Sequence, residues 1–302
     1  MTYTWTRDLR GYAGAPPHPQ WPNGARIAVS VVLNVEEGAE SSLLAGDTQN
    51  EVLYDMLSSV QDVVNLSMAS NFAYGARAGY WRVADMLDKY AVRCSVNACA
   101  VAFEQNPVLA ADCARRGYDI VAHGYRWRSH AHMDVVEERA TIGKAVETIG
   151  RLTGHRPVGW QTRSPAGLNT RRLLIEEGGF LYDSDTTEDD LPYLIDLGDR
   201  DYVVLPYTSD VNDIFLQRAE GSRLGRHFSE HAIGAFDWLY GEGATSPKML
   251  TIALHGRAIG RPGRIGALEA ILQHIRSREH VWFATRGEIA RHWIQQFGKY
   301  GR

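Results

Sequence analysis

Residues 27–35, IAVSVVLNV, form a nearly continuous run of β-branched and other apolar residues. A strand with one face in water alternates apolar and polar residues, so a run like this suits a parallel strand that is buried on both faces. Shorter runs of the same kind then alternate with amphipathic helical segments toward the C-terminus. Alternation over about 280 residues predicts one α/β domain, and about seven or eight strand–helix units favour an irregular (β/α) barrel over an open sheet.

Local signals divide the chain further. Residues 13–24, AGAPPHPQWPNG, are rich in proline and glycine, so we expect an N-terminal arm over residues 1–24 and a single barrel domain over residues 25–302. Asp134 is predicted to cap a long helix that ends at Gly154, because apolar residues recur on one helical face between them. No Gly-x-Gly-x-x-Gly motif follows a strand, which disfavours a dinucleotide-binding fold.

Composition narrows the class of protein. The formal net charge is −4 and the sequence pI is about 6.3, which gives no indication of a nucleic-acid partner. Apolar runs are too short to predict a membrane span, and the first residues, MTYTWTRDLRGYAG, lack the apolar run of a signal peptide. Cys94, Cys99 and Cys113 form no Cys-x-x-Cys motif and are typical of reduced thiols. We therefore expect a cytoplasmic protein.

Polar and ionisable residues follow several of the predicted strands. In a (β/α) barrel the active site lies at the C-terminal ends of the strands, so these residues are expected to meet at one rim. A lone histidine or acidic pair is more often structural, but so many groups at the same end of a sheet indicate a site. They are Glu36 and Glu37; His123; Thr162, Arg163, Ser164 and Pro165; Asp183 and Asp185; Asp210, Asn212 and Asp213; and His255.

These residue types suggest a hydrolysis. A carboxylate can act as general base on water, and a histidine can act as general acid toward a leaving nitrogen or oxygen, so we assign Glu36 or Glu37 and His255 to these roles. Arg163 is predicted to orient the base carboxylate or to stabilise developing negative charge, and Asp185 to set the tautomer of His255. A Ser-His-Asp triad is disfavoured because the chain has no Gly-x-Ser-x-Gly elbow.

In their order along the chain, these residues resemble the polysaccharide deacetylase superfamily, known also as the NodB-homology superfamily or carbohydrate esterase family four. The resemblance spans roughly residues 7–296 and implies a distorted (β/α) barrel of about seven or eight parallel strands. The family's four motifs are two adjacent acids, His-x-x-x-His, Arg-x-Pro-x-Gly and Leu-His. In this chain they stand as Glu36–Glu37, His123-Gly-Tyr-Arg-Trp127, Arg163-Ser-Pro165-Ala-Gly167 and Leu254–His255.

One branch of the superfamily is the most similar. It holds metal-independent allantoinases and cytosolic peptidoglycan-deacetylase-like proteins, and it implies a homotetramer. The segments that carry this likeness are RDLRGYAGAPPHPQWPNGARIAV, NVEEGAE, YDSDTTEDDLPY, PYTSDVND and HGRAIGRPGR. The stretch GWQTRSPAG, residues 159–167, departs from the allantoinase-like members and is closer to the deacetylase motif. The resemblance therefore leaves the substrate open.

A second departure concerns the metal site. The family's typical ligands are an aspartate and two histidines, whereas this chain has Glu37 and Trp127 at two of these positions. A catalytic zinc needs about three protein ligands, and the indole N–H of Trp127 is a donor that cannot ligate. We therefore expect no cofactor. Zinc or another divalent metal would require Glu37 and His123, with His130 or His132 as a further ligand.

The remaining pocket residues follow from the same placement. Without a metal, the oxyanion would rely on Arg163, Arg126 or backbone N–H groups. Trp127 is expected to cover the pocket floor with a flat apolar face suited to a ring-shaped substrate, and His123 to form a hydrogen bond, with Glu37 as its partner. The expected substrate-binding residues are Glu37, His123, Arg126, Trp127, Trp160, Pro165, Asp210 and Asn212.

The resulting hypothesis is a cytoplasmic, polysaccharide-deacetylase-like hydrolase of non-peptide carbon–nitrogen bonds. Its expected substrate is a small-molecule amide, either an acetylated sugar, a ureide or another cyclic amide. The expected catalytic residues are Glu36, Arg163, His255 and Asp185. Two alternatives stay open: an allantoinase-like ring opening, and a non-catalytic barrel that binds a ligand through Arg163 and the acidic rim.

Overall fold

The computed structural model describes residues 3–51, 60–217 and 224–300 and is organised around β1 (Ile27–Val35), which is buried along its whole length. One edge of β1 pairs with β8 (Lys248–His255). The other edge is shared, with β9 (Val281–Phe283) beside the first half and β2 (Ser95–Ala98) beside the second. Because neighbours flank β1 on both edges and helices cover the sheet, its apolar run has no face in water.

The sheet curls into an incomplete barrel. In the described ranges it has nine strands in the order β6-β7-β5-β4-β3-β2-β1-β8, with β9 beside β1. Beyond β8, Asn212 forms a parallel bridge with Ala253, which extends the curl toward closure. All strand pairs are parallel except β6 with β7, so the predicted distorted barrel is confirmed with one antiparallel strand that was not foreseen. The remaining strands are β3 (Asp119–Ala122), β4 (Gly159–Trp160), β5 (Tyr182–Asp183), β6 (Tyr193–Asp196) and β7 (Asp201–Val204).

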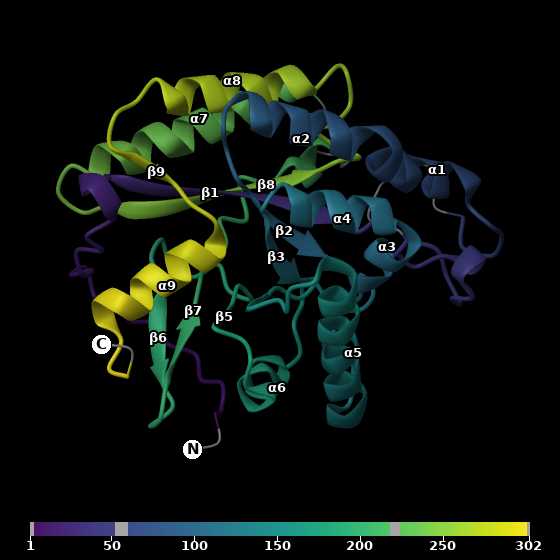
Figure 1. Cartoon of the computed structure of the whole chain (residues 1–302), viewed down its shortest axis with the longest axis horizontal. Helices are drawn as coiled ribbons and strands as arrows, with labels where there is room; N and C mark the ends of the chain where they lie inside the picture. Colours follow the sequence, from purple (N-terminus) through teal and green to yellow (C-terminus); the bar gives the residue numbers. More distant parts are fainter. Residues whose placement is uncertain (1–2, 52–59, 218–223, 301–302) are drawn as a thin grey trace.

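Helices cover the sheet from outside. Figure 1 shows α7 and α8 side by side along the β1–β8 part of the sheet, α5 and α6 near β3 to β5, and α9 beside β6 and β7. The π-helical turn η3 (Gly75–Gly79) joins α1 to α2. The helices are α1 (Leu66–Tyr74), α2 (Tyr80–Lys89), α3 (Ala100–Gln105), α4 (Pro107–Arg115), α5 (Val135–Thr153), α6 (Thr170–Glu177), α7 (Gly225–Glu242), α8 (Ile265–Arg276) and α9 (Arg286–Phe297), with 3-10 turns η1 (Pro22–Gly24), η2 (Leu43–Ala45) and η4 (Asp213–Gln217).

Helix α5 begins and ends as the sequence predicts. The Asp134 carboxylate accepts hydrogen bonds from the backbone N–H groups of Val136 and Glu137 at 2.8 and 2.9 Å, which satisfies donors that have no partner inside the helix. Gly154 ends the helix in a left-handed conformation, with φ of 76°. Helix α5 therefore starts just after the loop that carries His123 and Trp127.

The described part of the N-terminal arm packs against its own chain. Trp21 is buried, and its indole Nε1 donates to the backbone oxygen of Lys248 at 3.0 Å. The Tyr12 hydroxyl donates to the backbone oxygen of Pro192 at 2.5 Å. Over the described ranges, no helix combines the length and apolar character needed to cross a lipid bilayer.

Candidate active site

Charged side chains gather where β1 and β8 end. Asn34 of β1 pairs in parallel register with His255 of β8, so Glu36 emerges from the sheet beside His255. His123 follows β3 and Gln161 follows β4 at the same edge. This convergence is the rim that the strand-end pattern predicted.

A cavity of about 530 Å³ opens at this edge, a volume in the range of small-molecule sites. Its walls come from the ends of β1, β3, β4, β5 and β8 and from the segment after β7. Its lining is mainly hydroxyl, amide and ionisable groups, with Trp127 as the largest aromatic face. The lining residues are Asn34, Glu36, His123, Trp127, Gln161, Thr162, Arg163, Ser164, Ala166, Ser184, Asp185, Thr186, Thr187, Tyr207, Ser209, Asn212, Ile214, Phe215 and His255.

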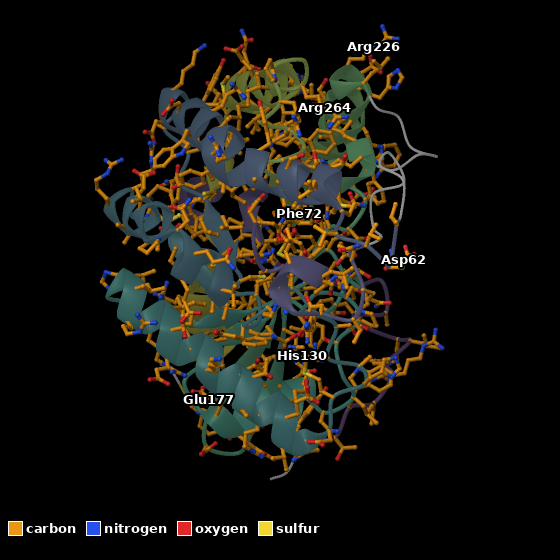
Figure 2. The ribbon with its side chains drawn as sticks, turned by 90° about the vertical axis from the view of Figure 1, so that its right-hand side faces the viewer. Asp62, Phe72, His130, Glu177, Arg226 and Arg264 are labelled. Carbon is orange, nitrogen blue, oxygen red and sulfur yellow. The ribbon has the colours of Figure 1, made fainter. Side chains whose placement is uncertain are left out.

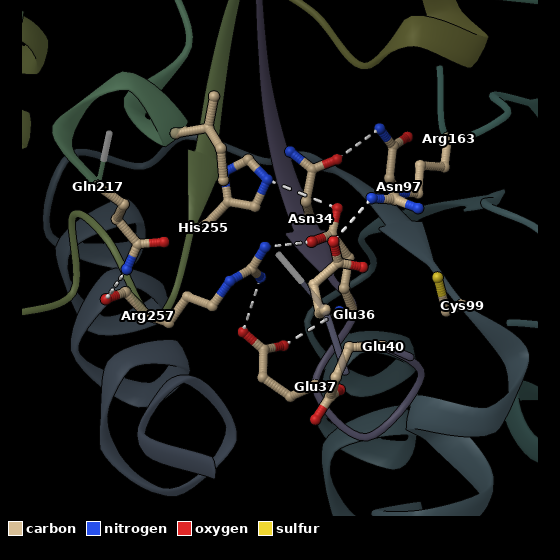
Figure 3. Close-up of polar contacts among 12 residues, drawn as sticks. Asn34, Glu36, Glu37, Glu40, Asn97, Cys99, Arg163, Gln217, His255 and Arg257 are labelled. Atoms are coloured by element: carbon tan, nitrogen blue, oxygen red, sulfur yellow. Dashed lines mark hydrogen bonds and ion pairs between the residues drawn. The ribbon is translucent and has the colours of Figure 1, made fainter. Parts of the chain in front are cut away.

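Arg257 is the cation that holds both glutamates. Its guanidinium is fully buried and donates to Glu36 Oε2 and, at 3.3 Å, to Glu37 Oε1 (Figure 3). Burial alone would raise the pKa of Glu36, but Arg257 and the neighbouring imidazoles of His255 and His123 hold it well below its ordinary value. Burial raises the pKa of Glu37 despite Arg257. Glu36 is therefore the more firmly ionised of the two.

Two glycines allow this buried arrangement. A Cβ atom at Gly79 would lie 1.9 Å from the backbone oxygen of Gly256, and one at Gly75 would lie 2.1 Å from Glu37 Oε1. Any larger residue would push the α1–α2 segment away from the loop after β8. The close approach places Phe72 of α1 over the guanidinium of Arg257, whose Cζ lies 4.5 Å from the ring centroid.

His255 is oriented by Asp213. Its Nδ1 lies 2.6 Å from Asp213 Oδ1, and Asp213 Oδ2 accepts the backbone N–H groups of His255 and Ile259 at 2.8 and 3.0 Å. His255 Nε2 lies 3.5 Å from Glu36 Oε1. Burial alone would lower the pKa of His255, but the carboxylates of Glu36 and Asp213 raise it to about 9. His255 is therefore a protonated imidazolium at neutral pH, as a general acid must be.

His123 approaches the same carboxylate from the other side. Its Nδ1 lies 2.6 Å from the backbone oxygen of Gln161, which can only accept, so Nδ1 carries the proton of this hydrogen bond. Its Nε2 is then turned toward Glu36 Oε1, at 3.3 Å. The expected partner of His123 was Glu37, so this detail of the prediction is wrong. Glu36 is the shared centre of the cluster.

Trp127 forms the wall of the cavity between two arginines. The guanidinium carbon of Arg163 lies 4.3 Å from its ring centroid, and that of Arg257 lies 5.4 Å away. Only 5% of Trp127 is exposed, and it packs edge-on against Phe72. Trp127 therefore borders the cavity, but its ring faces guanidinium groups and is almost fully covered, so the predicted open flat face is not present.

The structure corrects two predicted contacts. Arg163 was expected to orient Glu36, but its Nη2 donates to Glu51 Oε1 at 2.9 Å. The arginine that pairs with Glu36 is Arg257. Asp185 was expected to set the tautomer of His255, but it accepts the Thr162 N–H and hydroxyl, each at 2.6 Å. Asp185 still lines the cavity, and burial together with the nearby Asp183 raises its pKa to about 6.

Five residues expected to bind substrate do not line the cavity, namely Glu37, Arg126, Trp160, Pro165 and Asp210. Arg126 pairs with Asp47 at 2.7 Å. Trp160 is fully buried in the core, Pro165 is exposed, and Asp210 is a surface residue 3.2 Å from His231. Trp160 is the last residue of β4, whereas Arg126, Pro165 and Asp210 follow strand ends in sequence without lining the cavity. Asn212 does line the cavity, whereas Glu37 lies behind it against Arg257.

Sequence reasoning missed Arg257, and it placed Asp213 at the rim without assigning it a role. Arg257 lies two positions after the strand-end histidine His255, and Asp213 follows β7 beside two other polar residues. Their sequence signal was only this proximity to strand ends. Nothing in the order of residues shows that Arg257, rather than Arg163, reaches Glu36.

The donor set does not fit a divalent cation. Trp127 stands where the family motif has its second histidine, and the Arg257 guanidinium already lies between Glu36 and Glu37. Among the described residues, no three histidine, cysteine, aspartate or glutamate side chains converge as a metal site requires. A metal placed beside Glu37 would have to displace this guanidinium.

The two other histidines considered as ligands lie elsewhere. His130 is buried with its Nδ1 3.1 Å from Glu138 Oε1, and its ring packs edge-on against Trp160. Figure 2 shows His130 beside the teal ribbon of α5, well below Phe72. His132 is exposed. Neither histidine extends the cluster around Glu36.

Comparison with known proteins identifies the family to which this chain belongs. A family model described as polysaccharide deacetylase matches residues 63–179. A putative polysaccharide deacetylase of Schizosaccharomyces pombe (strain 972 / ATCC 24843) is 37% identical over 310 residues, which cover 95% of this chain and 97% of that one. This chain belongs to the polysaccharide deacetylase family. It is therefore a hydrolase of the family that acts on amide bonds, as the motifs predicted.

Two solved structures are similar over nearly the whole chain. A probable polysaccharide deacetylase from Pseudomonas aeruginosa PAO1 is 45% identical, with a TM-score of 0.93, and the match covers 97% of this chain and 99% of the other. PuuE allantoinase is 43% identical, also with a TM-score of 0.93, and the match covers 98% and 99%. The fold is therefore shared with proteins whose names indicate different amide substrates.

Proposed function

We propose that this chain hydrolyses a small cyclic amide of the ureide type, by attack of water on a ring carbonyl and without a metal. The observation that carries the proposal is the buried Glu36–Arg257 pair at the base of the cavity, with His255 beside it. The likeness to PuuE allantoinase over 98% of this chain supports the ring-opening alternative. Residues 159–167 are instead closer to the deacetylase motif, so this stretch by itself does not indicate a ureide substrate.

In the proposed reaction, Glu36 takes a proton from a water molecule and the oxygen of that water attacks the carbonyl carbon. The tetrahedral intermediate then expels the ring nitrogen, which receives its proton from His255 Nε2. Asp213 holds the imidazolium in place through the 2.6 Å contact to Nδ1. Collapse of the intermediate yields a carboxylic acid and a ureido group on the same opened product, so the net change is the addition of one water.

Positively charged side chains in the site are proposed to provide the electrostatic stabilisation that a bound metal provides in other hydrolases. Arg257 neutralises Glu36 before substrate binds, and His255 and Arg163 bring further positive charge to the walls. Groups that are preorganised in a buried site stabilise developing negative charge without reorganising during the reaction. Because Arg257 is anchored by two glutamates, it stabilises the base and not the leaving group.

The cavity walls favour a compact polar ring as substrate. Hydroxyl and amide side chains line most of the cavity and offer hydrogen bonds. A ureide ring presents alternating N–H and carbonyl groups in one plane, which matches these polar walls. The cavity volume of about 530 Å³ is in the range of small-molecule sites.

A substrate screen followed by NMR tests the proposal. The purified protein is incubated with allantoin, hydantoin, dihydrouracil and succinimide, and in parallel with N-acetylglucosamine and a chitin oligomer. We expect ring opening of at least one cyclic amide, with no such reaction from the Glu36→Gln variant purified in the same way. Acetate release from the sugars without ring opening would support sugar deacetylation instead. Saturable binding without any turnover would support the non-catalytic alternative.

We also propose that the protein acts in the cytoplasm as a homotetramer. All three cysteines are buried free thiols, which is typical of a reducing compartment. The tetramer rests on the resemblance to the allantoinase-like branch. A small soluble amide would be the natural substrate in this setting.

A further inference from the structure

Arg286 is a buried cation with neutral partners. It is the first residue of α9, and its side chain has no exposed surface. Its guanidinium donates to Ser184 Oγ, to Thr251 Oγ1 and to the backbone oxygens of Leu205 and Pro206. In the described part of the chain, no carboxylate lies within ion-pair distance of it. Because an unpaired buried charge is costly, its presence calls for a functional reason.

The guanidinium determines what the Ser184 hydroxyl can do. Nε and Nη2 of Arg286 both donate to Ser184 Oγ, at 3.1 and 2.7 Å. A guanidinium can only donate, so Ser184 Oγ accepts from it through its lone pairs and its O–H is directed elsewhere. Ser184 lines the cavity, and over the described ranges its O–H has no protein acceptor. Ser184 is therefore an obligate hydrogen-bond donor toward the cavity.

A chain of hydrogen-bonded amide side chains fixes the orientation of the Gln161 amide, so that its nitrogen is also a donor toward the cavity. The Leu254 backbone oxygen can only accept, so it binds Asn34 Nδ2, at 3.2 Å, and turns Asn34 Oδ1 toward Asn97. Asn97 Nδ2 then donates to both Asn34 Oδ1 and Gln161 Oε1, at 2.9 and 2.6 Å. With its oxygen occupied, Gln161 is left with Nε2 as the free end of its amide. Gln161 lines the cavity, so this end is a second donor.

The two donors stand side by side. Trp160 pairs with Asp183 in the β4–β5 register, so Gln161 and Ser184 are the next residues on neighbouring strands. The Ser184 backbone N–H donates to the Trp160 oxygen at 2.8 Å, which keeps the strands together at this point. Neighbouring strands lie about 4.8 Å apart, so two uncharged donors at this spacing suit one carbonyl oxygen between them.

This pair is separated from the base. The sheet order places β2 and β3 between β1, which precedes Glu36, and β4, which precedes Gln161. His123 contacts the backbone oxygen of Gln161 at one nitrogen and faces Glu36 at the other. Ser184 lies one strand further away. An oxygen held by Gln161 and Ser184 therefore belongs to a different carbonyl from the one that Glu36-activated water attacks.

We propose that Gln161 Nε2 and Ser184 Oγ form a two-donor site for a second carbonyl oxygen of the substrate ring, and that Arg286 is the positioning residue of this site. The inference rests on the proposed ring hydrolysis and deepens it. It assigns the enzyme to rings with two carbonyl groups, as in imides and ureides, and not to simple lactams. The buried charge of Arg286 polarises the Ser184 hydroxyl and strengthens its hydrogen bond.

The test compares two five-membered rings that differ in one carbonyl, succinimide and 2-pyrrolidinone. Binding of each is measured by ligand-observed NMR titration, and turnover by ring opening, for wild type, Ser184→Ala, Gln161→Met and Arg286→Lys. We expect wild type to prefer succinimide, and Ser184→Ala and Gln161→Met each to reduce that preference about 10-fold, mainly through KM. Arg286→Lys keeps the positive charge but lacks the paired N–H groups that hold Ser184, so the preference for succinimide should fall in this variant as well. Ser229→Ala, which removes a buried hydroxyl on α7 that does not line the cavity, is the matched control and should leave the preference unchanged.

The outcomes separate this inference from the proposed function. If wild type binds succinimide in a Ser184-dependent manner but opens no ring, the proposed function is wrong and the recognition pair stands. If Ser184→Ala and Gln161→Met bind both rings as wild type does, the recognition pair is refuted whatever the turnover. Equal losses on both rings, appearing in kcat, would assign the donors to the attacked carbonyl and refute the inference. Gln161 does not contact Arg286, so Gln161→Met keeps the test decisive if Ser184→Ala fails to fold.

Discussion

Replacing Asp213 by asparagine should remove the general acid while changing the shape of the site very little. In the structure Asp213 Oδ2 accepts two backbone N–H groups, from His255 and Ile259, while Oδ1 faces His255 Nδ1. In Asp213→Asn, the amide oxygen must face the two backbone N–H groups, because the amide nitrogen cannot accept hydrogen bonds from them. The amide nitrogen then faces Nδ1 and donates to it, so the imidazole is neutral with its proton on Nε2.

The size of the effect follows from the charges around His255. Its pKa rises from 6.5 to about 9, and at about 1.4 kcal/mol per pKa unit this favours the imidazolium by about 3 kcal/mol. Glu36 and Asp213 share that stabilisation, so removing Asp213 removes a large part of it. General acid catalysis contributes about 100- to 10,000-fold, and we expect kcat at pH 7.5 to fall by about 100- to 1,000-fold.

The pH dependence gives the sharpest assay. In wild type, kcat should fall as pH rises through about 9, where His255 loses its proton, and in Asp213→Asn this fall should move to lower pH. The raised pKa of His255 also contributes to the free energy of unfolding; this contribution is fully present below pH 6.5 and is lost as pH rises through about 9. Thermal melts should therefore show this loss in wild type and a smaller loss in Asp213→Asn. Asp210→Asn, three residues away and exposed, is the matched control. A variant with wild-type kcat and an unshifted basic limb would refute the role of both residues.

Three further predictions concern the base, the metal and the assembly. Glu36→Gln should lower turnover by about 100-fold or more while substrate still binds, and near-wild-type turnover would remove Glu36 from the role of base. Wild type should purify with clearly less than one metal per chain and stay active in chelator, and the double variant Trp127→His with Glu37→Asp should gain measurable zinc affinity by calorimetry. One firmly bound metal per wild-type chain, with activity lost on chelation, would contradict the metal-free proposal. Light scattering should give a tetramer at micromolar concentration, and a monomer of 33.7 kDa would contradict the proposed assembly.

The sequence alone was sufficient for the fold class and for the edge of the sheet where the site lies. The run at residues 27–35 is apolar at nearly every position, and this continuous pattern identifies a strand buried on both faces without any knowledge of its partners. The limits of α5 follow from Asp134 and Gly154 because caps are satisfied by neighbours within a few residues. Glu36, His123 and His255 were found at the site because parallel strands bring the residues after their ends to one edge.

The partners of these residues were decided only by the tertiary structure. Arg163 and Arg257 both follow strand ends, as do Asp185 and Asp213, and sequence position gives no reason to prefer one of each pair. Arg257 reaches Glu36 because glycines in the α1–α2 segment let that segment close over the loop after β8. Such contacts depend on distances between side chains from strands far apart in the chain. Local periodicity specifies which residues form each element, but it does not contain those distances.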